Sequence, residues 1–407
     1  MTAPEFPPQS LPQSPPQSLP KSQLQCPPRQ EGELRQRQEQ GELRVRVAAE
    51  YRDLVREVGL AEAYAATDVV VAADAGFMDQ GCLVLSLGPT DPPIRLRTGL
   101  LAGVPGLTGC GSGELVLPIG GGLGEGAALS GAQLLRALLE GQSLPFNASG
   151  EATPLHPRRE LHTELSLEQI GAGRLLLHRA ISENGVVAVN RAEGPCPSPY
   201  GTLLGKAANA LYNCGGAGSI GLTMPGLSLL GPGSPVLVGG GLGWVVGAGS
   251  GHQPGCKRQA SGHARTPGAA AAVSVDLHAL RPEWVRPCFF EGHGSALLVA
   301  VAAPVPLVNA RVALQAATGP EQLEVPVLDL SVPRRVKPRL ASVTYAELLS
   351  GEISLKGQPV ACAPSHSPRL AAAIAEALVE ALCCGEFPLR LPAAALSSRA
   401  SLLPIEA

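Results

Sequence analysis

Cysteine is the residue type in this chain that offers the most chemistry: ten are present, and no two form a CxxC pair. A thiolate is a nucleophile, and backbone N–H groups beside it favour its formation. Cys214 lies in the segment YNCGGAG, between Asn213 and the pair Gly215 and Gly216. The backbone N–H groups of this loop could therefore face a thiolate or an oxyanion. The same pattern also fits a small buried residue in a glycine-rich turn.

Other side chains offer a second thiol, an imidazole and anion-binding charges. Cys82 begins the apolar run CLVLSLG, a position typical of the core as well as of a nucleophile. His252, in GSGHQP, either lines a site or caps a turn. The segment TDPPIRL supplies Asp91 and Arg95 for binding an anion, and VPRR supplies Arg334, with solvated surface charge as the alternative. The eight histidines are scattered without zinc-ligand spacing, so no metal site is predicted.

The glycine-rich stretch PVLVGGGLGWVVGAGSGHQPGC, residues 235–256, resembles a nucleotide loop only superficially. Its glycines miss the G-x-G-x-x-G spacing by one residue, and no Lys-Ser/Thr pair follows them as in a P-loop. Residues 207–255 contain no Asp, Glu, Lys or Arg, but their glycines and prolines could not hold the continuous helix of about 20 residues that spans a membrane. A close-packed β-turn-β corner is the prediction.

These residues need a scaffold, and the hydrophobic pattern predicts strands interspersed with a few helices. Predicted strands cover residues 68–74, 82–88, 113–120, 185–190, 234–240, 242–249, 271–277 and 295–308. Predicted helices cover residues 42–58, 130–139 and 369–384, with Ser130 as an N-cap, and residues 157–181 read as mixed helix and turn. The predicted fold is α/β or α+β, with a large mixed β-sheet core, glycine-rich loops and flanking helices.

Composition divides the chain into a functional unit and two tails. Residues 1–41 are rich in Pro, Gln and Ser, contain a near-repeat of PPQSLP, and are predicted to be a disordered tail in which Cys26 is exposed. Residues 42–392 contain no low-complexity linker and are predicted to form one functional domain. Residues 393–407 are a C-terminal tail.

Charge and cysteine usage exclude some classes of partner. The net charge is −3 and no long run of Lys or Arg occurs, so nucleic acid is not an expected partner. The N-terminus lacks the features of a secretory leader, and ten cysteines in such a chain indicate free thiols in a reducing compartment, the cytoplasm. We expect a small-molecule substrate and no association with a membrane. A homo-oligomer is compatible with the sequence.

Several motifs, in order, resemble the homocysteine biosynthesis family, formerly a domain of unknown function. The resemblance covers about residues 42–392 and rests on ATDVVVAADAGFMDQGCLVLSLGPTDPPIRL, YGTLLGKAANALYNCGGAG, GPGSPVLVGGGLGWVVGAGSGHQP, AAVSVDLHALRPEWV and VLDLSVPRRVKPRLASVTYAELLSGEISLKGQPVACAPSHS. It implies incorporation of sulfur, from sulfide or a persulfide, at the aldehyde of aspartate semialdehyde, with reduction to homocysteine. It also implies an external low-potential electron donor, a small ferredoxin-like protein, and no bound cofactor is evident in the sequence.

The resemblance implies cysteine thiolates as sulfur carriers, and here the chain departs from the family pattern. That pattern places one cysteine directly after G-x-M, where this chain has Asp79, and another before a Pro-Arg element, where it has Leu155. Cys214 and Cys82 are the thiols that could replace them, with His252 as a further catalytic candidate. Asn213, Gly215, Gly216, Asp91, Arg95, Arg334 and the corner residues Gly240 and Gly241 are the predicted substrate-binding set.

Two other functions stay open on the sequence alone. The chain could be a degenerate family member that binds a small metabolite or a sulfur-carrier partner without catalysis, because both expected cysteines are replaced. A weaker alternative is an α/β enzyme that acts on an acyl or thioester substrate.

Overall fold

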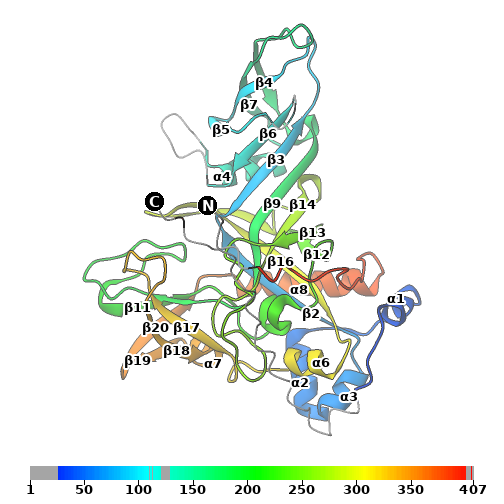
Figure 1. The fold of residues 1–407 in the computed structure, drawn as a ribbon, viewed down its shortest axis with the longest axis vertical. Coiled ribbons are helices and arrows are strands. Elements are labelled where there is room, and N and C mark those ends of the chain that lie inside the picture. Colours follow the sequence, from blue (N-terminus) through cyan, green and yellow to red (C-terminus); the bar gives the residue numbers. More distant parts are fainter. Residues whose placement is uncertain (1–25, 110, 112, 121–128, 400–404, 406–407) are drawn as a thin grey trace, which may run out of the picture.

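The computed structural model describes residues 26–109, 111, 113–120, 129–399 and 405. Residues 1–25, which make up most of the predicted tail, lie outside the described residues. Cys110 also lies outside them. Over the described residues the fold is a mixture of helices with three sheets (Figure 1). The predicted class, α/β or α+β with a large mixed sheet, is confirmed.

The main sheet has ten strands, most of them antiparallel, and β1 runs parallel to β2. Along the sheet the strands are β1 (Val45–Val47), β2 (Val69–Met78), β16 (Gly294–Pro306), β12 (Pro235–Val238), β13 (Gly241–Ala248), β14 (Ala270–Asp276), β9 (Ile170–Ser182), β3 (Gly81–Leu87) and β6 (Glu114–Pro118), while β15 (Val285–Phe290) pairs with β16. Strands β2 and β16 are nearly continuous apolar runs because both faces of the sheet are covered in this region.

Helices cover the two faces unequally. The helices are α1 (Glu31–Glu39), α2 (Ala48–Val58), α3 (Leu60–Ala65), α4 (Gly131–Leu139), α5 (Ile220–Thr223), α6 (Ala310–Ala316), α7 (Tyr345–Leu349) and α8 (Pro368–Cys383). The long helix α8 packs on β1, β2 and β16 through buried residues such as Ile374 and Leu378. Helices α2, α3 and α6 gather on the other side of the sheet, below it in Figure 1.

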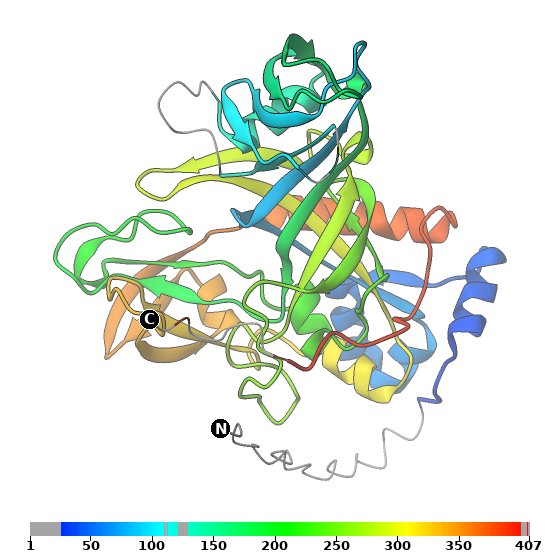
Figure 2. The same ribbon diagram turned by 45° about the horizontal axis from the view of Figure 1, so that its top comes forward.

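Two smaller sheets flank the main one. The first contains β18 (Arg339–Thr344), β17 (Glu324–Asp329), β10 (Val187–Val189), β11 (Asn209–Tyr212), β20 (Gln358–Pro364) and β19 (Glu352–Leu355). The second contains β5 (Val104–Gly106), β4 (Leu96–Leu101), β7 (Leu144–Gly150) and β8 (Glu160–Leu165), and it forms an arm at the top of Figure 1 that Figure 2 brings forward. The long strands β3 and β9 connect the arm to the body.

The sequence predictions hold where the hydrophobic pattern was unambiguous. All the predicted strands have counterparts, and Ser130 caps α4, because its Oγ accepts a hydrogen bond from the Gln133 N–H at 3.3 Å. Helix α2 ends at Gly59 as predicted, but it begins at Ala48 because strand β1 occupies residues 45–47. The nine described cysteines are free thiols, as predicted.

Two predictions were wrong. Residues 157–181 contain strands β8 and β9, with one short 3₁₀ turn at Leu167–Gln169 as the only helix, and burial along the middle of β9 alternates with a period of two, a pattern that its helix-forming leucines hid. Residues 31–39 form helix α1, and Cys26 is buried. This segment is held by Asp68, whose fully buried carboxylate pairs with Arg29, Arg37 and Arg44.

The predicted β-turn-β corner is confirmed as the tight hairpin between β12 and β13. Gly239 and Gly240 both have left-handed backbone conformations, with φ of +57° and +85°, which match a two-residue turn that favours glycine. The corner is also crowded, since a Cβ atom at position 240 would lie 2.7 Å from Cδ1 of Trp284. Glycine is therefore required here for packing and for conformation.

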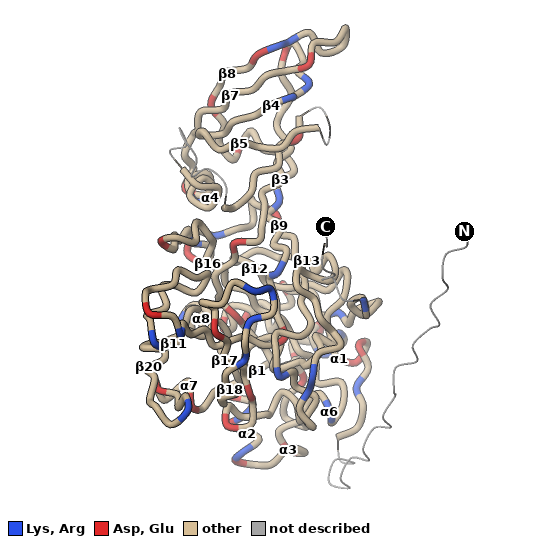
Figure 3. Tube along the Cα trace, turned by 60° about the vertical axis from the view of Figure 1, so that its left-hand side comes forward, with Lys and Arg blue, Asp and Glu red and all other residues tan. Residues whose placement is uncertain are grey.

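Charge is distributed evenly over the body and the arm. In the view of Figure 3, Lys and Arg lie interspersed with Asp and Glu over the described residues. In the part of the chain that the structure describes, no helix has the length and apolar character needed to cross a bilayer.

Because the corner is crowded, adding a methyl group there should lower the free energy of unfolding more than adding one at an uncrowded glycine. Gly240→Ala should lower the free energy of unfolding by about 2–5 kcal/mol, from left-handed strain plus the clash with Trp284. Gly233 has a similar φ of +82° with no atom within 4 Å of its Cβ position, so Gly233→Ala should cost only the strain, about 1–2 kcal/mol. Urea denaturation measures both, and equal losses would contradict the packing argument.

Candidate active site

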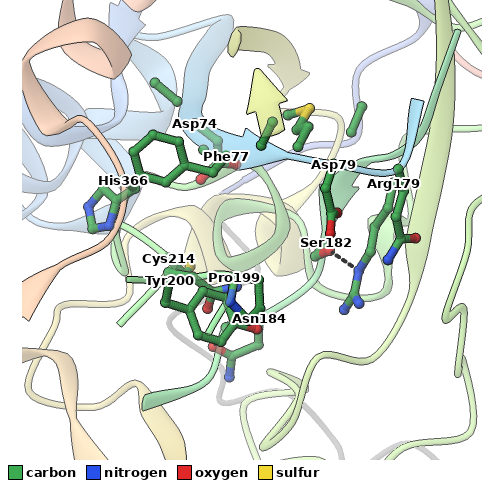
Figure 4. A pocket seen from close by; sticks show the side chains of 18 of the residues that line it. Asp74, Phe77, Asp79, Arg179, Ser182, Asn184, Pro199, Tyr200, Cys214 and His366 are labelled. Atoms are coloured by element: carbon green, nitrogen blue, oxygen red, sulfur yellow. Dashed lines mark hydrogen bonds between the residues drawn. The ribbon is translucent and has the colours of Figure 1, made fainter. Parts of the chain in front are cut away.

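A cavity of about 180 Å³ lies where the main sheet meets the six-stranded sheet. It is bounded by the second half of β2, the end of β9 with the residues that follow it, the loop that carries Cys214, and His366. Figure 4 shows Asp74 and Phe77 above the cavity, Cys214 and Asn184 below it, and His366 and Arg179 on opposite sides. We call this space the first cavity.

Asp74 is an acid within the apolar strand β2. Its Oδ2 accepts a hydrogen bond from the Ile220 N–H, at the first residue of α5, at 2.9 Å. Burial raises the pKa of Asp74 to about 6, and the hydrogen bond from Ile220 opposes that shift. Asp74 is therefore partly protonated near neutral pH, which is the property of a group that both accepts and donates protons.

Cys214 is buried, with its Sγ 3.5 Å from the hydroxyl oxygen of Ser219. Burial and the nearby charge of Asp74 raise the pKa of Cys214 to about 11, while hydrogen bonds with Ser219, Tyr345 and the Gly216 N–H lower it. The thiol is consequently protonated at neutral pH, and it needs a base before it can act as a nucleophile.

The loop around Cys214 is fixed by a buried tyrosine and an asparagine. The Tyr345 hydroxyl donates to Asn184 Oδ1 at 2.6 Å, and Asn184 Nδ2 donates to the carbonyl oxygens of Ala264 and Glu324 at 2.6 and 2.9 Å. Gly216 has φ of +75°, and a Cβ atom there would lie 2.5 Å from Cδ1 of Tyr345. Only glycine lets the loop pass this close to the ring.

His366 is placed as a neutral base. Its Nδ1 lies 3.4 Å from the carbonyl oxygen of Tyr212, and because a carbonyl can only accept, Nδ1 carries the proton. Nε2 is then the acceptor, and it lies 3.7 Å from the position that a Cβ atom of Gly215 would occupy. Burial lowers the pKa of His366, which keeps the imidazole neutral.

The opposite side of the cavity is charged. Arg179 Nε donates to Ser182 Oγ at 3.0 Å, and among the described residues no ion pair engages the Arg179 guanidinium. Asp79 pairs with His293 across 3.2 Å, and both residues line the cavity. The arrangement joins a cation for an anionic substrate with a thiol, a base and an acid that is half-protonated near pH 6.

Comparison with known proteins identifies the family of the chain. Residues 43–389 match the protein family described as homocysteine biosynthesis enzyme, sulfur-incorporation. The chain belongs to this family. It is 28% identical over 374 residues to an L-aspartate semialdehyde sulfurtransferase of Methanosarcina acetivorans, a match that spans 91% of this chain and 72% of that relative. It is 27% identical over 341 residues to a protein of the same name from Methanocaldococcus jannaschii, spanning 79% of this chain and 63% of the relative. No solved structure matches the chain.

The two positions where the family pattern predicts cysteine lie in different parts of the structure. Asp79 lines the first cavity, which Cys214 also lines. Leu155 is 79% exposed between β7 and β8 in the arm and is not among the residues that line the cavity. Cys214 therefore lines the same space as position 79, where the family resemblance implies a cysteine.

The structure brings together only part of the predicted binding set. Cys214 and Asn213 line the first cavity, and Asn213 Oδ1 accepts a hydrogen bond from the Val186 N–H at 2.8 Å. Gly215 lines an adjoining cavity, and Gly216 packs on Tyr345.

Cys82 and His252 lie outside the first cavity. Cys82 is half-buried in β3 with its Sγ 4.0 Å from His178 Nε2, and burial raises its pKa. His252 is buried, its Nε2 donates to the carbonyl oxygen of Ser397 at 2.7 Å, and its Nδ1 accepts from the Ala270 N–H at 3.0 Å. These contacts anchor the C-terminal segment to the sheet.

The remaining predicted residues are also placed elsewhere. Asp91 and Arg95 are exposed on the arm, where Arg95 lies 4.0 Å from Glu151. Arg334 is exposed after β17, and Gly240 and Gly241 belong to the hairpin corner. None of them is among the residues that line the first cavity.

Several residues of the cavity were not predicted as site residues. Asp74 had a sequence signal, since it is the only acid inside the apolar run VVVAADAGF. His366 lies in the family-like segment APSHS, directly before α8. Arg179 and Asn184 gave no local signal, because the fold alone brings the end of β9 to the cysteine loop.

The raised pKa of Asp74 predicts how replacing it changes stability with pH. The pKa is about 6 in the folded protein against an ordinary value of 3.8, so the folded state holds the proton more tightly. The stability contribution of Asp74 is therefore greatest at low pH and falls as pH rises from about 4 to 6. Asp74→Asn should stabilise the protein above pH 6, by at most about 3 kcal/mol, and should not do so at pH 4.

Urea denaturation at pH 4 and pH 8 measures this difference, with Asp79→Asn as the exposed control in the same cavity. An Asp74→Asn variant that gains no stability at pH 8 relative to pH 4 would contradict an elevated pKa.

Proposed function

We propose that this chain incorporates sulfur into L-aspartate semialdehyde and so forms homocysteine. Family membership and the names of the two methanogen relatives support the substrate and the product. The observation that carries the proposal is the shared cavity: Cys214 lines the space that also contains position 79, where the family pattern predicts a catalytic cysteine.

The net reaction consumes an aldehyde, a sulfur donor and electrons. With sulfide, the aldehyde gains one H₂S, two electrons and two protons, loses one water, and leaves as the thiol. If a persulfide donor first transfers its sulfane sulfur to Cys214 and leaves as a thiol, four electrons and four protons are then needed, because the sulfane sulfur on Cys214 must also be reduced. Cys214 returns to the free thiol when the sulfur–sulfur bond breaks.

Substrate binding follows from the charges of the first cavity. The guanidinium of Arg179 is the proposed partner of the substrate carboxylate, because no carboxylate of the described residues pairs with it. The amide of Asn213 is held by the Val186 N–H through its oxygen, which leaves its Nδ2 to donate to the oxygen that forms when sulfur adds to the aldehyde.

A proton relay overcomes the high pKa of Cys214. His366 Nε2 is the acceptor that takes the proton from the sulfur nucleophile. Asp74, protonated in part near neutral pH, donates to the aldehyde oxygen as it gains charge. This order of proton transfers avoids placing a Cys214 thiolate beside an Asp74 carboxylate, an arrangement that burial makes unfavourable.

Electrons come from outside the chain in this proposal. The sequence has no cysteine spacing typical of an iron–sulfur cluster. An external low-potential donor, such as a ferredoxin-like protein, is the proposed source, as the family resemblance implies.

A second function is favoured by the state of the thiols. Burial raises the pKa of both Cys214 and Cys82, so neither is a resting thiolate. A protein that binds the aldehyde or a sulfur carrier without turnover would have the same cavity, and activity measurements separate the two functions.

Homocysteine formation is the test. Purified protein supplied with aspartate semialdehyde, sulfide or a persulfide, and a strong low-potential reductant should yield homocysteine detectable by mass spectrometry. Cys214→Ser should abolish the product formed from the persulfide, and His366→Gln should slow its formation by about 10²-fold or more, because a positioned base contributes that much. Cys384→Ser, at the exposed end of α8, is the matched control and should keep full activity.

Cys82→Ser distinguishes the two candidate thiols, because it should retain activity if Cys214 is the carrier. Product that survives Cys214→Ser and disappears in Cys82→Ser would refute the role of Cys214. No product with either sulfur donor, in a protein that still binds the aldehyde, would favour the binding function.

A further inference from the structure

A second cavity of about 260 Å³ adjoins the first one on the far side of the cysteine loop. It lies among α2, α8, Tyr345 and the loop residues Gly215–Ser219. Asp74 and His366 line both cavities, so these two side chains form part of the wall between them. The proposed sulfur chemistry makes no use of this space.

Arg52 is the cation of the second cavity. Its Nη1 is buried and has no hydrogen-bond partner among the described residues, and burial lowers the pKa of the guanidinium. A Cβ atom at Gly218 would lie only 3.6 Å from this Nη1, so the guanidinium rests against the backbone of the loop that carries Cys214. By contrast Arg56, one turn further along α2, is exposed and pairs with Asp53 at 2.8 Å.

A buried guanidinium nitrogen without a partner costs free energy that an anion can recover. A carboxylate suits the planar guanidinium because it can accept two parallel hydrogen bonds. The unsatisfied Nη1 therefore indicates that the ligand of this cavity carries a carboxylate.

The other residues that line the second cavity indicate which further groups the ligand carries. Two acids, Asp74 and Glu376, line the same cavity as Arg52, and Glu376 is exposed on α8. Most of the other lining side chains are short and aliphatic, among them Val47, Ala49, Val71, Ala73, Ala371 and Ala372. One cation, two acids and an aliphatic wall complement a zwitterion with a small apolar side chain.

We propose that the second cavity binds an L-α-amino acid with a short aliphatic side chain, held as its zwitterion. The carboxylate binds Arg52, the ammonium group faces the acidic side of the cavity, and the side chain packs on the alanines of α2 and α8. This site does not depend on the proposed sulfur chemistry, because binding requires no turnover. Its ligand contacts Asp74 and His366, so occupancy of the second cavity is coupled to the first.

Isothermal titration calorimetry with L-norvaline tests the proposal. L-Norvaline should bind, whereas pentanoate, which lacks the ammonium group, and butylamine, which lacks the carboxylate, should bind at least tenfold more weakly. Arg52→Gln should weaken L-norvaline binding at least tenfold. Arg56→Gln, on the same helix, should bind L-norvaline like the parent protein.

Two further variants show which cavity holds the ligand and serve as controls for misfolding. Arg179→Gln removes the cation of the first cavity and should leave L-norvaline binding unchanged. Ala372→Phe adds a bulky side chain to the wall of the second cavity from an exposed position on α8, leaves Arg52 in the sequence, and should abolish binding. Three results would overturn the proposal: no binding of L-norvaline, loss of binding in Arg179→Gln but not in Arg52→Gln, or equal binding of pentanoate.

Discussion

The buried carboxylate of Glu183 ties together the segments around residues 226, 258 and 269 at the point where the chain passes from the main sheet to the six-stranded sheet. It has no exposed surface, accepts hydrogen bonds from the Gly226 and Ala269 N–H groups at 2.6 and 2.9 Å, and forms a two-point ion pair with the guanidinium of Arg258. All of its charge is thus compensated by donors from three separate segments, which is the condition under which a buried carboxylate is tolerated. Glu183 directly follows β9 of the main sheet, and β10 of the second sheet begins four residues later.

The contacts at this junction fix the positions of the residues that line the first cavity. Asn184, the next residue, spans the gap between the sheets through its bonds to Ala264 and Glu324 and receives the hydroxyl of Tyr345. Gly185 then passes so close to the cysteine loop that a Cβ atom there would lie 2.5 Å from Cβ of Cys214. The position of the thiol is therefore set by backbone packing and by a chain of buried polar contacts, each of which would be costly to leave unsatisfied.

Sequence alone could predict the elements but not this junction. Helix α8 and most strands of the main sheet (β2, β3, β6, β12, β13, β14 and β16) follow from local hydrophobic patterns, and the corner at Gly239 and Gly240 follows from glycine spacing. Local pattern failed at β9, whose leucines are typical of helices, and at α1, which is held by pairing between Asp68 and three arginines at a distance in sequence. The predicted loop around Cys214 does form one wall of the cavity, whereas Arg179, Asn184 and His366 reach it only through the pairing of strands far apart in the chain.

The family resemblance implies a cysteine at position 79, where this chain has Asp79, and under the proposed function this difference changes how sulfur would be activated. Asp79 is exposed and paired with His293, an environment in which a thiol would stand beside an imidazole that favours its thiolate. Cys214 lies deeper, beside Asp74, where burial and like charge keep the proton on sulfur. A thiol in that place is protected until a base removes its proton, so in this chain reactivity would be controlled by His366 and Asp74 and by whatever ligand changes their protonation. Because these two residues also line the second cavity, its occupancy is the means by which such control could reach the thiol.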